Sequence, residues 1–328
     1  MPIFPASPTT IDDAARVIRA GGLVAFPTET VYGLGGDATN SEAVAAIFEA
    51  KGRPSFNPLI VHVADLAAAQ LFGTFSKDAC RLAGSFWPGP LTLVVERRAG
   101  CPIADLASAG LNTLALRVPD HRVAKGLLRA AGCPIAAPSA NRSGHVSPTT
   151  ARHVDEDLGD RVAMILDGGA TEHGLESTVV DASGRELVLL RPGAITAEQI
   201  AATLGHAVKR AAECAEAPLS PGQLASHYAP RARLRLDASE AREGGSFVGV
   251  RAGGAVTRVR DQPQSGGQSS GSGGCAFCGT EGVRRGGIGG GGRHANPRDG
   301  FRRCHQRSLA AGGCAATVIE CDACRALI

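Results

Sequence analysis

The chain has 328 residues, of which 44% are hydrophobic and 20% charged, and its net charge of +3 is close to balanced. This composition is typical of a globular protein of one large or two ordinary domains and argues neither for nor against nucleic acid as a partner. Aromatic residues make up 4% of the chain, which disfavours a stacking platform for single-stranded bases. No apolar run approaches the roughly 18 residues that span a bilayer. The N-terminal stretch has neither a basic nor an apolar region, so we expect a cytoplasmic protein.

Helices and strands interleave over the first 205 residues. Capping residues and helical spacing predict helices over 10–22, 41–51, 66–71, 121–131 and 197–204. Short apolar runs predict strands over 23–26, 58–63, 90–96, 114–118, 135–137, 164–167, 177–181 and 187–191. Because the two kinds of element do not alternate strictly, we predict an α/β fold with a twisted mixed sheet and flanking helices.

Polar clusters follow several of these strands. The first, residues 27–34 (PTETVYGL), supplies hydroxyls, a carboxylate and a glycine, and further clusters fall within 51–62, 139–147 and 177–191. Ligands of open α/β sheets bind at strand ends, so a cleft is expected there. The chain contains no GxxxxGK[ST] loop and no HExxH sequence, and no GxGxxG opens a predicted helix. A nucleotide would therefore need another kind of cradle.

Individual side chains leave alternatives open. Lys51 and Arg53 suit a polyanion such as a triphosphate, or they complement a helix dipole. His62, inside an apolar strand, is a core histidine or a ligand-binding group. Arg117, also inside a strand, either reaches solvent or meets an anion. Residues 139–144 are polar groups of a site or an ordinary hydrophilic turn.

Taken together, the clusters resemble one family. PTETVYGL, KGRPSFNPLIVHV, FWPGPLTLV, LALRVPDH, PSANRSG, ESTVVD and LRPG occur in the order and spacing of the YrdC-like threonylcarbamoyl-AMP synthases, over roughly residues 8–205. Residues 220–230 resemble the linker of the long form, which adds a small Rossmann-like C-terminal domain. The resemblance implies a synthase domain over 1–205 with a large cleft, a linker over 206–235 and a C-terminal domain from 236.

The resemblance implies a nucleotidyltransferase that joins L-threonine, bicarbonate and ATP into threonylcarbamoyl-AMP and pyrophosphate. The product would pass to a transferase that modifies adenosine 37 of tRNAs. Mg²⁺ would accompany ATP, with no metal held by the protein alone. Lys51 and Arg53 would stabilise charge, and no residue is required as a covalent nucleophile. The implied threonine ligands are Thr30, His62, Arg117, Ala137 and Ser177; the implied ATP ligands are Lys51, Arg53, Asn57, Thr113, Ser139, Ser147, Arg191, His227 and Tyr228.

Two other functions share this fold. One is an RNA-binding YrdC-like protein without synthase activity, and the other is a carbamoyl-handling domain of the hydrogenase-maturation type. Lys51 and Arg53 together with residues 139–141 favour the synthase. The linker departs from the family pattern at Gln223, Leu224 and Ala225, which affects how His227 or Tyr228 would close over the nucleotide.

The tail differs from the rest of the chain. Six of the ten cysteines lie beyond residue 249 among many Gly, Ser and Arg residues, and two CxxC pairs there (275–278 and 321–324) would ordinarily suggest zinc. Shifting the codons by one nucleotide permits AMPIPATGFGDAINDRLRR for residues 293–311 and AINLSPGGNLVEAAAALFA for 260–278, both similar to the end of the long form. We therefore expect a shifted reading frame from about residue 250 and no bound zinc. Residues 236–328 would be an unstructured remnant in which strand 246–250 lacks partners, and activity would be impaired.

Overall fold

The computed structural model describes residues 3–211, 233–235, 245–250, 256–260 and 316–320. The chain forms two compact units, Met1–His227 and Tyr228–Ile328. This division falls within the predicted linker, and the predicted boundaries at 205 and 235 stay predictions. His227, Tyr228 and the six cysteines of the tail lie outside the described residues.

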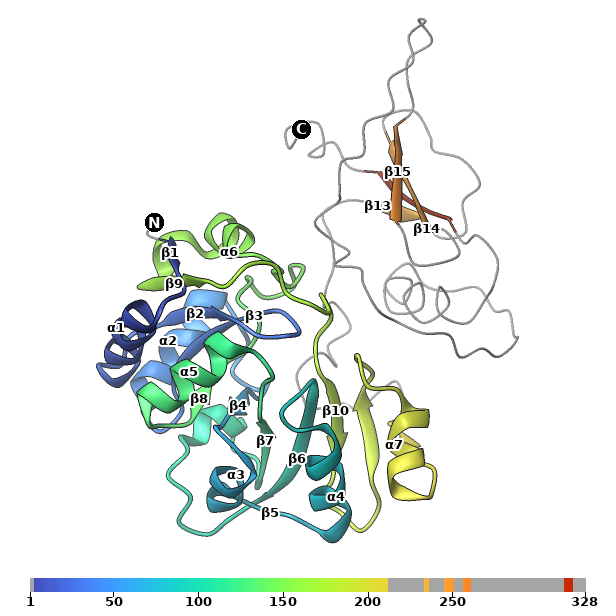
Figure 1. Ribbon diagram of the computed structural model, residues 1–328. Coiled ribbons are helices and arrows are strands. Elements are labelled where there is room, and N and C mark those ends of the chain that lie inside the picture. Colours follow the sequence, from blue (N-terminus) through green and yellow to red (C-terminus); the bar gives the residue numbers. More distant parts are fainter. Residues whose placement is uncertain (1–2, 212–232, 236–244, 251–255, 261–315, 321–328) are drawn as a thin grey trace, which may run out of the picture. The chain divides into compact units, whose positions relative to one another are not determined.

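The first unit is built on a twelve-stranded mixed sheet (Figure 1), as the sequence predicts. Parallel pairs such as β4–β7 stand beside antiparallel ones such as β6–β7. The strands lie in the order β1 (Ile3–Pro5), β9 (Met164–Asp167), β2 (Val24–Pro27), β3 (Tyr32–Asp37), β8 (Ile135–Ala136), β4 (Ile60–His62), β7 (Thr113–Arg117), β6 (Leu91–Arg97), β10 (Thr178–Asp181), β11 (Val188–Arg191) and β12 (Lys209–Arg210), and β5 (Gly73–Thr74) pairs with β6.

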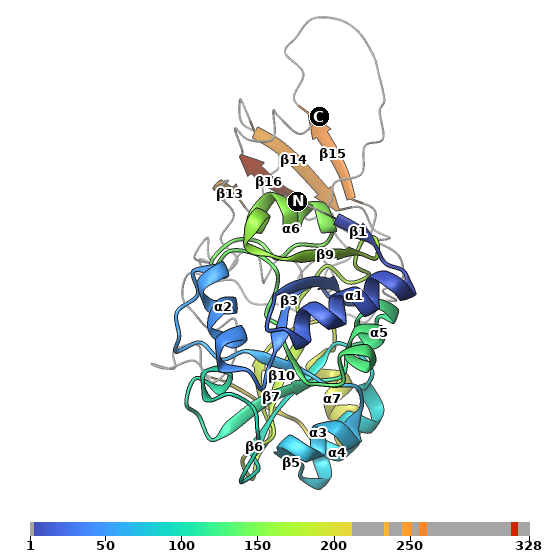
Figure 2. The same cartoon turned by 90° about the vertical axis from the view of Figure 1, so that its left-hand side faces the viewer.

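Helices pack on the sheet in neighbouring pairs. Helix α1 lies beside α5, and α4 lies beside α7 (Figures 1 and 2). Ile18 of α1, Leu127 of α5 and Phe26 of β2 are fully buried in one apolar cluster, and burying a side chain of this size contributes roughly 1.5–3 kcal/mol. The helices are α1 (Pro8–Arg19), α2 (Ser41–Lys51), α3 (Leu66–Phe72), α4 (Lys77–Phe86), α5 (Arg122–Ala131), α6 (Ala151–Leu158) and α7 (Ala197–Leu204), with 3₁₀ turns at Asp105–Ser108 and Gly159–Arg161.

The alternation along β4 and β7 decides which side chains reach the site. Val61 and Leu116 belong to the large core, whereas Ile60 and Ala115 belong to a small cluster on the other face. His62 stands two residues after Ile60, and Arg117 two residues after Ala115, so both share the face of the small cluster.

Local signals set the element ends differently from the predicted ones. Helix α1 begins at Pro8, not at Thr10, because Ser7 and Thr10 form a reciprocal capping box. Helix α2 has its predicted bounds, but Asn40 rather than Ser41 is its N-cap. Strand β3, helices α4 and α6 and the short strand β1 were not predicted. The glycine-rich sequence of β3 hides it, because glycine is depleted in strands.

The second unit contains a four-stranded antiparallel sheet in the order β13 (Arg233–Arg235), β16 (Ala316–Glu320), β14 (Gly245–Val250) and β15 (Val256–Arg260). The expectation that strand 246–250 lacks partners is therefore wrong, since β14 pairs with both β15 and β16. The backbone bonds of a strand do not depend on side-chain identity, so these pairings do not bear on the reading frame, which stays a prediction. In the described part of the chain, no helix has the length and apolar character to cross a membrane.

Candidate active site

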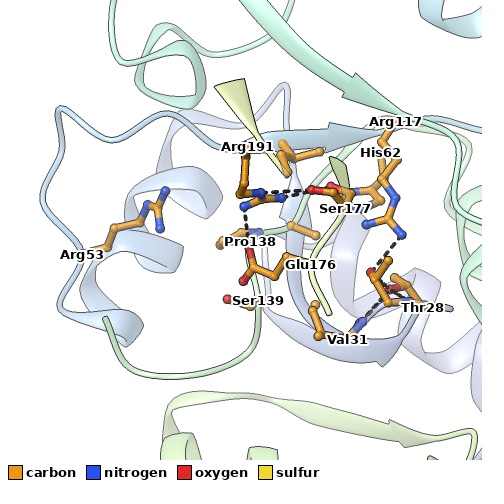
Figure 3. Close-up of a pocket in the computed structure, with 14 residues that line it drawn as sticks. Thr28, Val31, Arg53, His62, Arg117, Pro138, Ser139, Glu176, Ser177 and Arg191 are labelled. Carbon is orange, nitrogen blue, oxygen red and sulfur yellow. Dashed lines mark hydrogen bonds and ion pairs between the residues drawn. The ribbon is translucent and has the colours of Figure 1, made fainter. Parts of the chain in front are cut away.

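A pocket opens on the sheet face that carries His62 and Arg117 (Figure 3). Its walls come from the turn between β2 and β3, from the loop after α2, from β4 and β7, from the segment after β8, from the two residues before β10 and from the end of β11. All five residues predicted for threonine line it, namely Thr30, His62, Arg117, Ala137 and Ser177. Of the residues predicted for ATP, Arg53, Ser139 and Arg191 line the same pocket.

His62 lies directly opposite Arg117 in the parallel pairing of β4 with β7. Both side chains are buried, and the imidazole meets the ring of Phe26 edge to face, with centroids 6.3 Å apart. Burial and then the charge of Arg117 lower the pKa of His62 from 6.5 to about 3. Neither ring nitrogen makes a well-formed hydrogen bond among the described residues, and the nearby backbone of Ile60 and Ile135 offsets only part of the lowering of the pKa. A neutral imidazole with unused polar atoms in a pocket points to a ligand.

The Arg117 guanidinium is held from one side. Nη2 donates to Oε1 of Glu29 at 2.6 Å and to the hydroxyl of Thr30 at 2.9 Å. The Thr30 hydroxyl lies 2.8 Å from that of Thr28, which donates to the carbonyl of Val31 at 2.7 Å. Arg117 therefore neither reaches solvent nor stands alone, because the turn from Thr28 to Val31 supplies its anion and a hydroxyl.

A second arginine lies across the pocket. Arg191 donates through Nε to the carbonyl of Ser177 and through Nη2 to the Ser177 hydroxyl, both at 3.0 Å, and pairs with the carboxylate of Glu176. The other oxygen of Glu176 accepts from the Ser147 hydroxyl at 2.8 Å. Ser147 and Arg191, both predicted for ATP, thus meet on one pocket carboxylate (Figure 3 shows Glu176 and Arg191).

Gly193 allows the segments that carry Ser177 and Arg191 to pack closely together. A Cβ at this position would lie 2.4 Å from the backbone nitrogen of Thr178 and 2.5 Å from the carbonyl oxygen of Glu176. Only glycine fits so close to another backbone segment. The glycine of the LRPG sequence therefore lets the chain after β11 pack directly on the backbone at the start of β10, next to the contact between Ser177 and Arg191.

Lys51 is buried beside the pocket and is not one of its lining residues. Its ammonium group donates to the backbone carbonyls of Ser139, at 2.5 Å, and of Asn141. Burial and then the charge of Arg53 lower the pKa of Lys51 from 10.5 to about 7. Gly52 ends α2 in the left-handed conformation, with φ +58°. The chain turns there and sends Arg53 into the pocket wall.

Arg53 and Asn57 form a compact loop after α2. Arg53 donates to the carbonyls of Asn57 at 3.1 Å and Pro58 at 2.9 Å. The Asn57 side chain is fully buried, and neither of its amide atoms has a partner among the described residues. Such a group calls for a ligand or a water.

The remaining predicted residue lies elsewhere, and other lining residues were not predicted. Thr113 begins β7, about 13 Å along the strand from Arg117, and is not a lining residue of this pocket; its role toward ATP stays a prediction. Glu29 and Glu176 were not assigned, although each stands inside a motif quoted above. The unassigned lining residues are Thr28, Val31, Gly33, Ile60, Pro138 and Glu176.

Comparisons with known proteins agree with this geometry. Residues 16–193 match the Sua5/YciO/YrdC family model, described as "Telomere recombination", and residues 195–269 match the model of the threonylcarbamoyl-AMP synthase C-terminal domain. The chain is 48% identical to the threonylcarbamoyl-AMP synthase of Bacillus subtilis over 253 residues, 73% of each chain. It is 46% identical to that of Pyrococcus abyssi over 225 residues, 67% of this chain and 66% of the relative.

Structural similarity extends over the same region. A crystal structure of P. abyssi Sua5 complexed with L-threonine superposes with a TM-score of 0.67 and 43% identity, covering 70% of this chain and 68% of that one. The family match spans the strands and loops that build the pocket, and the second match makes this the two-domain form. The chain therefore belongs to the Sua5/YciO/YrdC family, in its form with a Sua5 C-terminal domain.

Proposed function

We propose that this chain is a threonylcarbamoyl-AMP synthase, a nucleotidyltransferase that uses L-threonine, bicarbonate and ATP. The observation that carries the proposal is the pair of His62 and Arg117, a neutral unpartnered imidazole directly opposite a buried cation at one end of the pocket. The relatives named threonylcarbamoyl-AMP synthase and the threonine complex of P. abyssi Sua5 support it.

The threonine end is the wall made by β4, β7 and the turn after β2. Arg117 supplies a cation for the substrate carboxylate, and Thr30 and Ser177 supply hydroxyls. Ala137 offers its backbone there. Neutral His62 can accept a hydrogen bond from one substrate group and donate to another, because it carries one protonated and one free ring nitrogen.

The nucleotide end lies toward Arg53, Ser139 and Arg191. Two buried guanidinium groups suit a triphosphate, which takes paired N–H donors well. The Glu176 carboxylate already contacts Arg191 and Ser147, so an entering phosphate would have to share or replace these contacts. Lys51 contributes indirectly, because it donates hydrogen bonds to the backbone carbonyls on either side of Ala140 and so fixes this part of the pocket wall.

The proposed chemistry proceeds in two steps. The amine of threonine attacks the carbon of bicarbonate, and loss of water leaves an N-carboxylate. A carboxylate oxygen then attacks the α-phosphorus of ATP, the α–β phosphoanhydride bond breaks, and pyrophosphate leaves with that electron pair. Positioning and cations over the developing negative charge account for most of the catalysis in such a reaction.

Mg²⁺ fits as a companion of the nucleotide. Among the described residues there is no group of three or more His, Cys, Asp or Glu side chains that could hold a metal, but one carboxylate, that of Glu176, lines the pocket. Phosphate oxygens would supply most ligands, as is usual for this ion. When bound, it would neutralise charge on the leaving pyrophosphate.

The product would be passed to a tRNA threonylcarbamoyl transferase for modification of adenosine 37, and contact with RNA is part of this proposal. Activity in the cytoplasm and reduced activity because of the altered tail also stay predictions. The alternative is an RNA-binding protein of the same fold without synthase activity.

Pyrophosphate release by the full chain, with ATP, Mg²⁺ and bicarbonate, tests the proposal. Release should depend on L-threonine and should fall in Arg117→Ala. The matched control Arg129→Ala removes an exposed arginine of α5 and should behave as the unaltered chain. A folded chain that binds RNA but neither binds L-threonine nor releases pyrophosphate would favour the alternative. Threonine binding with slow release would indicate impairment by the tail.

A further inference from the structure

Glu29 is a buried carboxylate next to the pocket, and its side chain is 3% exposed. Both of its oxygens are used. Oε1 accepts from Nη2 of Arg117 at 2.6 Å, and Oε2 accepts from the backbone nitrogen of Asp120 at 3.0 Å. Its own carbonyl accepts from the backbone nitrogen of His173 at 2.9 Å. Glu29 thus joins the turn after β2 to the segment after β7 and to the loop that precedes β10.

The contacts of Arg117 show what Glu29 achieves. Nη2 has two hydrogens, and Glu29 and Thr30 take both. Nε lies 3.4 Å from the carbonyl of Gly89. Among the described residues, none accepts a hydrogen bond from Nη1. Because a guanidinium is planar and rigid, fixing Nη2 and Nε also fixes the direction of the Nη1 hydrogens.

We infer that Glu29 is a positioning residue for substrate recognition, which aims the Nη1 edge of Arg117 at the carboxylate of the amino-acid substrate. The inference rests on the proposed function, and it adds a residue that never touches the substrate. It also implies that Arg117 meets the carboxylate with Nη1 alone, because Glu29 and Thr30 occupy the edge that a two-pronged contact would need.

Charge supports the same assignment. Arg117 is 5% exposed, and a buried cation without a partner carries a large desolvation cost. Glu29 neutralises this cation and stays in place when a substrate anion binds, since the backbone nitrogen of Asp120 holds its second oxygen. Glu176 beside Arg191 differs, because it is 14% exposed and lines the pocket itself.

Binding measurements on three variants of the full chain test the inference. Glu29→Gln keeps the size and one acceptor oxygen but removes the charge. Glu29→Asp keeps the charge and withdraws it by one methylene. The control Glu49→Gln makes the same charge change at an exposed position of α2. Calorimetry would give the affinity of each protein for L-threonine, for L-threoninol, which lacks the carboxylate, and for a non-hydrolysable ATP analogue.

We expect Glu29→Gln to weaken L-threonine binding by about ten- to a hundredfold, the size of one hydrogen bond to a charged group. Binding of L-threoninol and of the ATP analogue should change less than about twofold. Glu29→Asp should weaken L-threonine binding to a smaller extent, and Glu49→Gln should leave all three affinities unchanged. If Glu29→Gln does not fold, as judged by circular dichroism, Glu29→Asp carries the test by the same comparison.

Two outcomes would overturn the inference separately from the proposed function. Equal losses for all three ligands, or unchanged L-threonine affinity, would show that Glu29 only supports the fold or does nothing to Arg117. Failure of the unaltered chain to bind L-threonine at all would instead overturn the proposed function, and the inference with it.

Discussion

The ammonium group of Lys51 donates a 2.5 Å hydrogen bond to the backbone carbonyl of Ser139 and a second one to the carbonyl of Asn141. The end of α2 is thereby fastened to the segment after β8, some ninety residues further along the chain. Since burial lowers the pKa of this lysine to about 7, the group can be a neutral amine at neutral pH and still donate both bonds.

Lys51→Met should remove a pH-dependent part of the free energy of unfolding. The folded chain releases the Lys51 proton near pH 7 and the unfolded chain near 10.5, so the unfolded state binds more protons between these values. The unaltered chain should therefore gain stability over the variant as pH rises from 7, by at most about 1.4 kcal/mol per pH unit. Urea unfolding at pH 7, 8 and 9 measures the difference, with exposed Lys77→Met as control. A difference that stays constant with pH would contradict the expectation.

His62→Leu should make the protein more stable and less able to bind substrate. The change removes a buried imidazole whose ring nitrogens make no well-formed hydrogen bond among the described residues, and burying such a side chain costs about 1–3 kcal/mol. We expect a gain of about 1–3 kcal/mol at pH 7 together with weaker L-threonine binding. Thermal unfolding and calorimetry measure the two effects.

The stability of the same variant should also depend on pH differently in acid. In the unaltered chain the pKa of His62 falls from 6.5 to about 3 on folding, so the unfolded state binds more protons within this window and stability falls as pH drops through it. His62→Leu should lack this loss, whereas His206→Leu, at an exposed position, should keep it. A less stable His62→Leu protein at pH 7 would show that the imidazole has a structural partner.

Gly193→Ala should damage the nucleotide corner. Its Cβ would fall 2.4 Å from the Thr178 nitrogen, and such overpacking typically costs about 1–3 kcal/mol. The segments that carry Ser177 and Arg191 would separate, so ATP affinity and the melting temperature should both fall. Gly184→Ala is the matched control, since its Cβ would have no atom closer than 3.8 Å. An unchanged melting temperature in Gly193→Ala would rule out the tight contact.

The reading frame can be tested on the gene itself. If residues beyond about 250 arise from a shift of one nucleotide, resequencing across codons 245–255 should either reveal the missing or extra base or reproduce the same frame. In the second case, restoring the frame should produce a chain containing NLSP and AINDRL. A chain with the restored frame should release pyrophosphate faster than the present one; equal rates would mean that the tail does not impair activity.

The strands that carry the site could be predicted from local pattern. LIVHV and LALRV each place one polar residue in an apolar run, which was enough to expect His62 and Arg117 inside strands. That the two residues lie side by side could not be predicted from the local sequence, because it depends on the register between β4 and β7. Thr113, which was assigned from the family resemblance, lies on β7 like Arg117 but at the opposite end of that strand.

The carboxylates were missed for a related reason. Glu29 and Arg117 are 88 positions apart in the chain, and the spacing of charges in a sequence does not reveal pairs formed only by the tertiary fold. Lys51 illustrates the converse. Its sequence context suggested a phosphate ligand or a partner of the helix dipole. The structure shows its ammonium group on two backbone carbonyls, and its role toward ATP stays a prediction. A cationic side chain in such a loop can donate hydrogen bonds to backbone carbonyls as well as to a ligand.

The parallel pairing of β4 with β7 ties recognition to folding. A slip of β4 by one residue against β7 would turn His62 into the large apolar core and bring Val61 to the pocket face, while Arg117 kept its place. A sheet in this wrong register would lack the pair of His62 and Arg117 on which the proposed recognition of the amino acid depends. Substrate should therefore select the correctly registered chain during maturation and protect it afterwards, by an amount that grows with the logarithm of its concentration.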